Sequence, residues 1–480
     1  MESIWSRETK LTERDSFIGN SKAEVAVIGA GIAGILIAHN LKKCGLDVVV
    51  LEADGIGSGQ TKNTTAKITS QHGLFYDKLI KNVGREKAER YAIANQRAIN
   101  EYQRIIESEK IDCDFERLPA YLYSTEDDLD FCNTRLGNTK SGNIKSGRES
   151  LEREVEAANS LGIRAEFENE SELPFKVSGV AKFLEQAQFN PLKFISGITE
   201  NLTIYENSRV LSVKDHMVYT ERGDIWADNI VFATHYPIIN VPGFYFIRQH
   251  QERSYVLAMK NAQKLKGMYY GIDKDGLSFR NSGDILLLGG SGHRTGENEK
   301  LREKNMENSE NLEGCCGAYE YLRRKAKEFY PKHQEISHWS AQDCLTHDNI
   351  PFIGRYSYLK PYWYVATGFK KWGMTSSMVS AMIITDEIMG NENPYSEVFT
   401  PQRFNCRASY KNLIKDIGVS IKGLSKGYLK KNTHQCAHMG CALNWNEDEK
   451  TWDCSCHGSR FDENGKLIDE PAQSGVNLKE

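Results

Sequence analysis

The stretch EVAVIGAGIAGILIAHNLKKCGLDVVVLE, residues 24–52, decides the fold of the N-terminal part of the chain. A short apolar run leads into a G-x-G-x-x-G pattern, which apolar residues at helical spacing and a second apolar run follow. These features predict a strand, a tight turn, a helix and a second strand, which together make a βαβ unit. Its glycines are Gly29, Gly31 and Gly34, and Glu52 stands 23 residues after the first of them.

This unit predicts a dinucleotide site. Glycines let the backbone approach a pyrophosphate at a helix N-terminus, where unpaired N–H groups and the helix dipole favour anions. Glu52 stands where a carboxylate accepts hydrogen bonds from ribose hydroxyls. The alternative is a glycine-rich turn without a ligand. The other glycine cluster, Gly289-Gly290-Ser-Gly292-His-Arg-Thr295, lacks the third glycine of the motif and a following amphipathic helix, so the sequence shows no separate nicotinamide site.

Length and composition limit the other classes of function. At about 150 residues per domain, 480 residues predict roughly three domain-sized units. A net charge of −4 gives no global positive field for nucleic acid or an anionic membrane. The N-terminal residues have no apolar core or cleavage site of a signal peptide, and no apolar stretch is long enough to span a membrane. We therefore expect a cytoplasmic protein.

Several later segments resemble the D-amino-acid oxidase-like flavoproteins of the glycine and sarcosine oxidase type. They are the loop at 52–69, the strands at 208–210 and 228–234, and the closing segments at 348–354 and 365–375. The resemblance covers about residues 1–395 and implies FAD, held non-covalently because no cysteine stands at the family's attachment position. Besides the three glycines and Glu52, it implies that FAD contacts Thr61, Thr65, Ala66, Lys67, Val210, Ala233, Thr234, Gly354, Gly368, Gly373, Met374 and Thr375.

The family's closing motif opens a helix whose N-terminus faces the flavin edge where negative charge develops on reduction. Gly373, Met374 and Thr375 would occupy this position. A helix N-terminus stabilises an anion, so the motif suits a reduced flavin. The alternative is an ordinary helix start.

We expect an α/β fold with a discontinuous Rossmann-like FAD-binding domain, an inserted antiparallel-sheet substrate domain and a small all-β C-terminal domain. Charged helices are expected at 85–110 and 297–330. Residues 411–431 carry six lysines and one acid, which indicates a linker or a basic docking face. The predicted ranges are 1–104, 186–240 and 336–395 for the FAD-binding domain, 105–185 and 241–335 for the substrate domain, 396–430 for the linker, and 431–480 for the C-terminal domain.

The C-terminal domain carries a second redox motif. Cys436 and His438 form a C-x-H pair, and Cys454 and His457 form a C-x-x-H pair fifteen residues further on. The pairs resemble the Rieske motif, in which two thiolates hold one iron of a [2Fe-2S] cluster and two imidazoles hold the other. A zinc site of cysteine and histidine is the rival interpretation.

The Rieske resemblance also implies that Cys441 and Cys456 form the disulfide of the respiratory type of Rieske protein. Ser459 matches a serine that bonds to a cluster sulfur, whereas Phe461 replaces the family's tyrosine. Fewer hydrogen bonds then stabilise the added electron, so we expect a potential below that of the respiratory proteins. Pro471 resembles the proline-containing loop that covers the cluster in this family. The stretch before Cys436 is too short for the family's usual base strands, so we expect the domain to pack against the flavoprotein body.

Together, a flavin and a one-electron cluster convert hydride transfer into single-electron transfer. The leading hypothesis is a dehydrogenase or demethylating oxidoreductase for a small amine. Asp343 stands near the position of a carboxylate-binding arginine in the glycine oxidase branch, which favours a cationic amine. An ordinary surface acid is the alternative. Loop position places four further catalytic candidates near the flavin: Lys67, His72, Lys370 and Trp372. For His72 the alternative to acid or base work is an ordinary structural role, and for Lys370 it is a solvated side chain.

Two alternatives remain open from the residues. Electrons could run the other way, from ferredoxin or flavodoxin through the cluster to the flavin, with residues 411–431 docking such an acidic carrier. The protein could instead be a redox sensor or electron carrier whose pocket no longer turns over a substrate.

Overall fold

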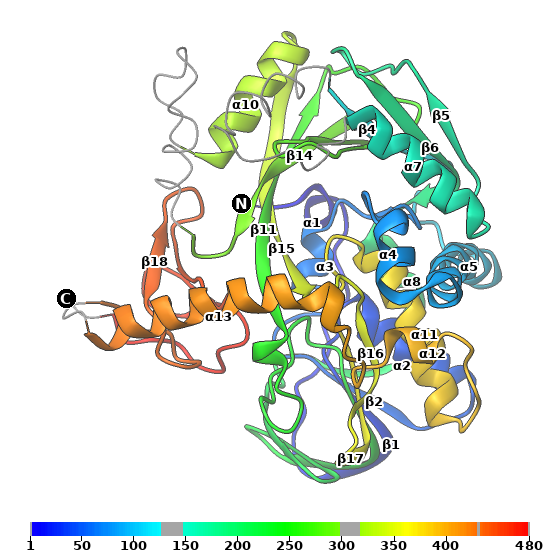
Figure 1. Cartoon of the computed structure of the whole chain (residues 1–480). Coiled ribbons are helices and arrows are strands. Elements are labelled where there is room, and N and C mark those ends of the chain that lie inside the picture. The colour runs from blue at the N-terminus through cyan, green and yellow to red at the C-terminus, as the bar shows by residue number, and fades with distance from the viewer. Residues whose placement is uncertain (1, 126–146, 298–316, 430–432, 479–480) are drawn as a thin grey trace.

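The computed structural model describes residues 2–125, 147–297, 317–429 and 433–478 (Figure 1). The predicted βαβ unit lies at the centre of the first sheet, whose strand order is β16-β17-β10-β1-β2-β7, with β9 pairing β10 and β8 pairing β9. The pairs that β1 forms with β2 and β10 are parallel. The strands are β1 (Ser21–Ile28), β2 (Val48–Leu51), β7 (Thr203–Tyr205), β8 (Val210–Lys214), β9 (Met217–Thr220), β10 (Asp224–Phe232), β16 (Phe352–Ser357) and β17 (Lys360–Thr367).

Helices cover this sheet and bury its apolar strands. The whole of β2 is buried, as expected for a parallel strand covered on both faces. Helix α11, whose first half is rich in serine, packs against α2 and against the long helix α5. The helices of this part are α1 (Ile4–Glu8), α2 (Ile32–Lys43), α3 (Gln60–Asn63), α4 (Tyr76–Val83), α5 (Arg85–Glu109), α8 (Pro191–Ile198), α11 (Gly373–Ile388) and α12 (Ser396–Phe399).

The second sheet has the order β15-β11-β14-β13-β12-β4-β6-β3, with β5 attached to β6. It is antiparallel, as expected, except that β4 and β12 run parallel. Its strands are β3 (Lys67–Ile68), β4 (Glu116–Ser124), β5 (Ala165–Glu168), β6 (Gly179–Gln188), β11 (Gln249–Lys260), β12 (Met268–Gly271), β13 (Ser278–Ser282), β14 (Ile285–Arg294) and β15 (Gln334–Thr346). Helices α7 (Gly147–Ser160) and α10 (Ala318–Phe329) and the short 3-10 helix η1 (Tyr245–Ile247) complete this part.

The chain crosses between the two sheets at different places from those predicted. β3 and all of β15 except its first two residues lie in ranges assigned to the FAD-binding domain, yet both belong to the second sheet because β3 pairs β6 and β15 pairs β11. The predicted helix at 85–110 is confirmed by α5. Of the charged stretch at 297–330, α10 forms the described part, and 298–316 lie outside the described residues.

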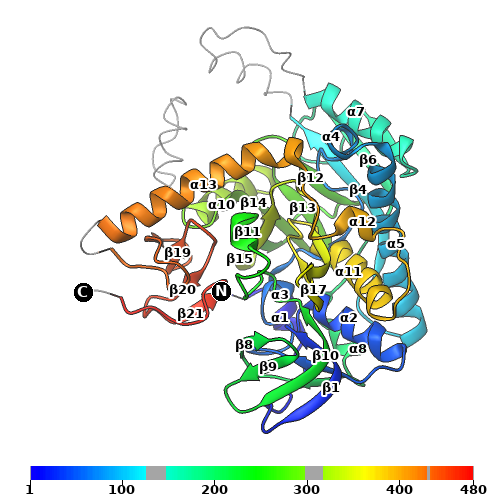
Figure 2. The same cartoon turned by 60° about the horizontal axis from the view of Figure 1, so that its bottom comes forward.

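The C-terminal part contains a small sheet of order β18-β19-β20-β21, reached through a long helix, α13 (Cys406–Leu429). The sheet comprises β18 (Leu443–Asn446), β19 (Thr451–Cys454), β20 (Arg460–Phe461) and β21 (Leu467–Asp469). The predicted linker is therefore largely helical over its described residues. Figures 1 and 2 show α13 running from the flavoprotein body along this sheet. No helix among the described residues combines the length and apolar character needed to cross a membrane.

Candidate functional site

The glycines and Glu52 converge at the N-terminus of α2. A Cβ on Gly29, whose φ is +104°, would lie 2.7 Å from the carbonyl oxygen of Ala233, and one on Gly34 would lie 1.9 Å from that of Gly29. Glu52 accepts a hydrogen bond of 2.7 Å from the Ala30 N–H. Burial raises the pKa of Glu52, although backbone donors oppose the shift. Glycine is thus required where the turn, the helix and β10 meet, which is the geometry of a dinucleotide cradle.

Gly31 and Thr61 complete the cradle. Gly31 is the N-cap of α2 and supplies no side-chain hydrogen bond to the helix, so the Thr61 Oγ1 accepts from the Ile32 N–H at 3.0 Å instead. These groups surround the helix end where an anion is favoured. Of the other predicted FAD residues, Thr234 closes a local turn by donating to the Tyr236 carbonyl, and Val210 begins β8.

Side chains from other segments fix the loop at 63–66 by donating hydrogen bonds to its backbone carbonyl groups. The Trp5 indole donates to the Thr64 carbonyl at 2.7 Å, and the Trp339 indole to that of Asn63 at 2.9 Å. The Arg280 guanidinium donates to the carbonyls of Thr65 and Ala66. Ala66 has a φ of +53°. These contacts set the path of the segment that the sequence predicted to touch the flavin.

Lys67 follows this loop and is buried by the second sheet. Its ammonium donates to the Tyr269 carbonyl at 3.0 Å and to the Ser278 Oγ at 2.6 Å. No ion pair is formed by Lys67 with any described residue. Burial, and then the nearby Arg280, lower the pKa of Lys67 to about 7. Lys67 therefore gains or loses a proton near neutrality.

His72 holds the segment after the loop against α11. Its Nδ1 lies 2.8 Å from the Tyr91 hydroxyl, and its Nε2 lies 2.8 Å from the Thr69 carbonyl. Its ring stacks on Trp372 with centroids 5.0 Å apart. Burial lowers the pKa of His72 to about 3. With both nitrogens engaged, His72 positions Trp372, which fits a structural role for this histidine.

The predicted closing motif forms the start of α11. Gly373 is the first residue of α11, and its N-cap Trp372 gives no side-chain hydrogen bond to the helix. The Tyr102 hydroxyl donates to the Met374 carbonyl at 2.9 Å, and the Thr375 hydroxyl to the Thr69 carbonyl at 3.1 Å. An uncapped helix N-terminus fits the negative edge of a flavin.

The two glycines before this helix have left-handed φ values, +121° for Gly354 and +74° for Gly368. A Cβ on Gly368 would lie 2.3 Å from the Thr346 Cγ2. Only glycine fits here without strain.

Asp343, the predicted attractant for an amine, forms an ion pair that the sequence analysis missed. Its Oδ2 lies 2.9 Å from the Lys371 Nζ, and Lys371 also donates to Ser254. Burial alone would lower the pKa of Lys371, but Asp343, with Tyr270 and Glu252, outweighs burial and raises it. The carboxylate is therefore already neutralised.

Lys370 lies beside this pair. Its φ is +53°, and its N–H donates to the Cys344 carbonyl at 2.8 Å. Burial lowers the pKa of Lys370 to about 8, against the opposing charge of Glu252. Tyr270, which packs edge-on to Trp372 at 5.5 Å, faces the same charged groups. Aromatic rings and lysine and acid side chains thus gather where β11, β15 and the start of α11 meet.

The four predicted iron ligands also converge. The rings of His438 and His457 lie 4.9 Å apart, and the Cys436 and Cys454 thiols are hydrogen-bonding neighbours. The Nδ1 atoms of both histidines are buried without a hydrogen-bond partner. Burial lowers the pKa of His438 to about 4 and that of His457 to about 3. Neutral imidazoles with free Nδ1 atoms beside two thiols fit a Rieske cluster.

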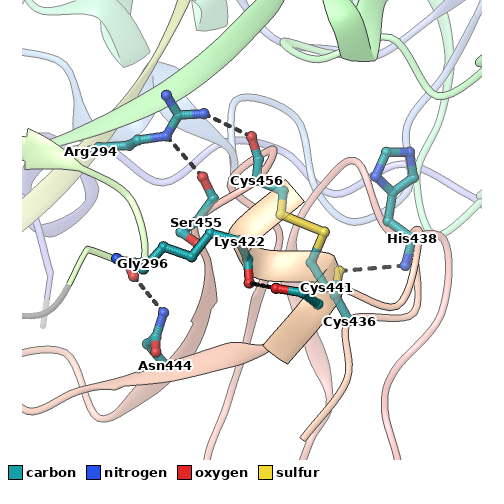
Figure 3. The surroundings of a disulfide bond; sticks show 10 residues. Arg294, Gly296, Lys422, Cys436, His438, Cys441, Asn444, Ser455 and Cys456 are labelled. Carbon is teal, nitrogen blue, oxygen red and sulfur yellow. Dashed lines mark hydrogen bonds between the residues drawn. A yellow bond between two sulfur atoms is a disulfide. The ribbon is translucent and has the colours of Figure 1, made fainter. Parts of the chain in front are cut away.

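The predicted disulfide is present and joins the two ligand loops (Figure 3). The sulfur of Cys454 lies within 4.8 Å of those of Cys441 and Cys456, but the last two are bonded to each other, so this trio offers a metal ion a single thiolate. The Ser459 Oγ accepts from the Ala472 N–H at 3.0 Å, directly after Pro471. Phe461 is fully buried among the cysteines.

The iron–sulfur domain rests on the flavoprotein body, as its short strands led us to expect. The Gln251 amide donates to the His457 carbonyl at 2.9 Å, and the Gln342 amide donates to that of Gly458 at 2.8 Å. The Nε2 of His438 lies 3.1 Å from the Asn240 Oδ1. The histidine side of the cluster site therefore faces the strand pair β11/β15 and the loop at 240–247.

Arg294 ties α13 to the same interface. Its guanidinium pairs with Asp416 of α13. It also donates to the carbonyls of Ser455, at 2.8 Å, and Cys456, at 3.0 Å (Figure 3). The sequence did not single out four residues of this interface: Asn240, Gln251, Gln342 and Arg294. Nothing in the residues around them marks a contact with a distant segment, and Gln251 bonds to His457, 206 residues further along the chain. Arg294 ends the glycine-containing segment that fitted no nucleotide motif.

Residues 24–387 match the DAO family, described as FAD dependent oxidoreductase, and residues 415–479 match the Rieske [2Fe-2S] domain. A Rieske 2Fe-2S iron-sulfur protein of Bacillus subtilis, YhfW, is 32% identical, over 98% of this chain and 96% of its own length. Solved structures of L-proline dehydrogenase from P. horikoshii and glycine oxidase from Geobacillus kaustophilus share the fold, with TM-scores of 0.60 and 0.59. They are 18% and 16% identical, each covering 80% of this chain, and 98% and 99% of their own lengths are matched.

Proposed function

Because the chain belongs to the DAO family of FAD dependent oxidoreductases and carries a Rieske [2Fe-2S] domain, we propose that it is an amine or amino-acid dehydrogenase that delivers single electrons to an external carrier. FAD, held non-covalently, supplies hydride acceptance, and the cluster supplies one-electron transfer. The substrate C–H loses a hydride and its nitrogen a proton, which leaves an imine that water hydrolyses. Two one-electron carriers each accept one electron, and two protons are released.

One observation supports this proposal most strongly: a short series of hydrogen bonds and one strand pairing connects the two sites. The His457 carbonyl accepts from the Gln251 side chain, and Gln251 pairs with Cys344 across β11 and β15. The Cys344 carbonyl accepts from the Lys370 N–H, three residues before α11 begins. Adjacent strands lie about 5 Å apart, so a single strand pair separates the cluster loop from the candidate active site. Such proximity supports electron exchange within one chain.

The charges beside Trp372 suit an amino-acid zwitterion. The sequence favoured a cationic amine because of Asp343, but Lys371 neutralises that carboxylate at 2.9 Å. An adjacent ammonium and carboxylate complement a substrate that carries both charges: Lys371 would take its carboxylate, and Asp343 its ammonium. Lys370, with a pKa of about 8, is partly neutral at pH 7 and can accept the proton that the substrate nitrogen releases.

Anaerobic titration with amines and amino acids tests the proposal. The flavin absorption band and the electron paramagnetic resonance signal of the reduced Rieske cluster are recorded together. We expect an amino acid to bleach the flavin and the cluster signal to follow. Polyamines bleaching the flavin in preference to amino acids would restore the cationic-amine expectation. If no compound bleached the flavin while ferredoxin reduced both centres, the result would contradict a dehydrogenase. It would favour electron flow in the reverse direction, from the carrier through the cluster to the flavin.

Two variants test which protein side chain binds each charged group of the substrate. Lys371→Met is expected to weaken the binding of amino acids but not of amines that lack a carboxylate. Asp343→Asn is expected to weaken the binding of both classes. Equal effects of Lys371→Met on both classes would remove the assignment of Lys371 to the substrate carboxylate.

A further inference from the structure

The outer face of α13 carries an apolar stripe of exposed side chains. The side chains of Ile414 and Ile421 are 67% and 63% exposed, which is unusual for isoleucine on a packed helix. They continue at helical spacing with three more exposed apolar residues, so that the stripe consists of Tyr410, Ile414, Ile417, Ile421 and Tyr428. An apolar stripe of this kind indicates an interaction surface.

Lysines lie along one side of this stripe. They are Lys411, Lys415, Lys422 and Lys426, and none of them forms an ion pair with a described residue. The single acid of α13, Asp416, points the other way and is buried against Arg294 and His250. The exposed surface of α13 therefore carries a row of positive charges beside an apolar row, although the whole chain has a net charge of −4.

The inner face of α13 lies directly on the iron–sulfur site. A Cβ on Gly423 would be 2.5 Å from the Cys456 Sγ, and one on Gly427 would be 2.2 Å from the Gly440 carbonyl oxygen. Only glycine permits this approach. A helix with its side chains is about 10–12 Å across, so the stripe lies within roughly one helix diameter of the disulfide that joins the ligand loops.

The opposite side of the cluster site is closed. Asn240 contacts His438, Gln251 holds the His457 loop, and His457 packs edge-on to Phe246 with ring centroids 6.0 Å apart. The flavoprotein body thus occupies the histidine side. The α13 side offers a short route to an external protein.

We propose that the outer face of α13 is the docking site for a small acidic one-electron carrier protein, of the ferredoxin or flavodoxin class. The lysines would attract the carrier's acidic rim, and the apolar stripe would pack against the apolar surface around its redox centre. This inference rests on the proposed function, since it names the partner that takes the electrons. A second copy of the chain and an anionic membrane are the competing occupants.

Binding to the full-length holoprotein tests the site, with an acidic plant-type ferredoxin and a flavodoxin as probes in isothermal titration calorimetry. Lys415→Glu/Lys422→Glu reverses two charges on the face, and Lys214→Glu/Lys274→Glu makes the same charge change on exposed lysines elsewhere. Ile417→Ser/Ile421→Ser removes the centre of the stripe. The Rieske paramagnetic resonance signal and circular dichroism check that each variant is folded.

We expect at least one carrier to bind with an affinity that falls as salt rises. The charge reversal should weaken its binding about tenfold or more, whereas the control pair leaves binding unchanged. The stripe variant should weaken binding at all salt concentrations. Equal binding by wild type and both α13 variants, or no binding of either carrier, would overturn the site.

Two other results would also overturn it. One is a dimer of the wild type that the stripe variant abolishes while no carrier binds. The other is binding to vesicles of phosphatidylglycerol and phosphatidylethanolamine in equal parts, without binding of a carrier. The proposed function fails separately: a carrier that binds at α13 while no amine or amino acid bleaches the flavin would contradict the dehydrogenase but keep the docking site.

Discussion

The side-chain amide of Gln251 donates a hydrogen bond of 2.9 Å to the backbone carbonyl of His457, a predicted iron ligand. The same amide donates to the Glu470 carbonyl, also at 2.9 Å, and its oxygen accepts from Gln342 at 2.8 Å. One buried side chain of the flavoprotein body therefore holds two loops of the iron–sulfur domain. Buried carbonyls that lose their donors are costly, so Gln251 fixes how the two domains meet.

Gln251→Leu is expected to loosen this interface by about 1–3 kcal/mol, because two buried carbonyls lose a donor. Hydrogen exchange across residues 454–472 should accelerate, and intramolecular electron transfer should slow. Gln263→Leu makes the same change at an exposed glutamine that bonds to the Glu172 carbonyl, and should leave both measurements unchanged. Unaltered exchange in Gln251→Leu would show that the contact does not hold the domain.

Asp416→Asn is expected to destabilise the joint between α13 and the body by about 3 kcal/mol or more, since it leaves the buried Arg294 without its carboxylate. Chemical denaturation monitored by the visible spectrum of the cluster measures the loss. Arg294→Met/Asp416→Leu removes both charges and should recover part of the stability. A double variant less stable than Asp416→Asn would contradict this coupling.

The same group predicts how stability depends on pH. Burial opposes the shift, but hydrogen bonds from His250 and His347 hold the pKa of Asp416 far below 3.8, so its contribution is lost only in strong acid. Asp416 and Glu252 outweigh burial and raise the pKa of His250 above 6.5. Its contribution is complete below pH 6.5 and is lost as pH rises through the raised pKa. Stability should therefore fall in the wild type as pH rises above 6.5, and this fall should disappear in His250→Gln.

The rate of flavin reduction by substrate is expected to rise with pH and level off above an inflection near 8, because Lys370 must be neutral to accept a proton. Lys370→Met should remove this inflection and lower the rate, while Lys274→Met, at an exposed site, should change neither. His72, with a pKa of about 3, contributes no inflection between pH 5 and 9. An inflection near 8 that persists in Lys370→Met would assign it to another group.

Phe461→Tyr is expected to raise the midpoint potential of the cluster. Phe461 is buried among the cysteines, so an added hydroxyl lies where it can donate to a sulfur. A hydrogen bond worth about 1.4 kcal/mol more to the reduced form corresponds to about 59 mV for one electron. Ser459→Ala should lower the potential by a similar amount. Protein-film voltammetry measures both, and an unchanged potential in Phe461→Tyr would place the hydroxyl out of reach.

The sequence alone predicted the parts of the molecule that local pattern encodes. Gly29 and Gly34 can only be glycine where a strand, a turn and a helix meet, and the spacing of Cys436, His438, Cys454 and His457 marks an iron–sulfur site. Both signals lie within short segments.

The remainder depends on contacts between distant segments. Lys371 neutralises Asp343 only because a turn before α11 lies beside β15, and Gly423 lets α13 pack closely on the disulfide. β3 and β15 likewise belong to the second sheet because they pair with strands that are distant in the sequence, β6 and β11. None of these contacts leaves a mark in the residues around it.

Flash photoreduction of the flavin, followed by the appearance of the reduced Rieske signal at several protein concentrations, tests the central claim most directly. The account predicts cluster reduction with a first-order rate that is independent of protein concentration, since one strand pair separates the two sites. A rate proportional to protein concentration, or a flavin that stays reduced beside an oxidised cluster, would contradict electron exchange within the chain.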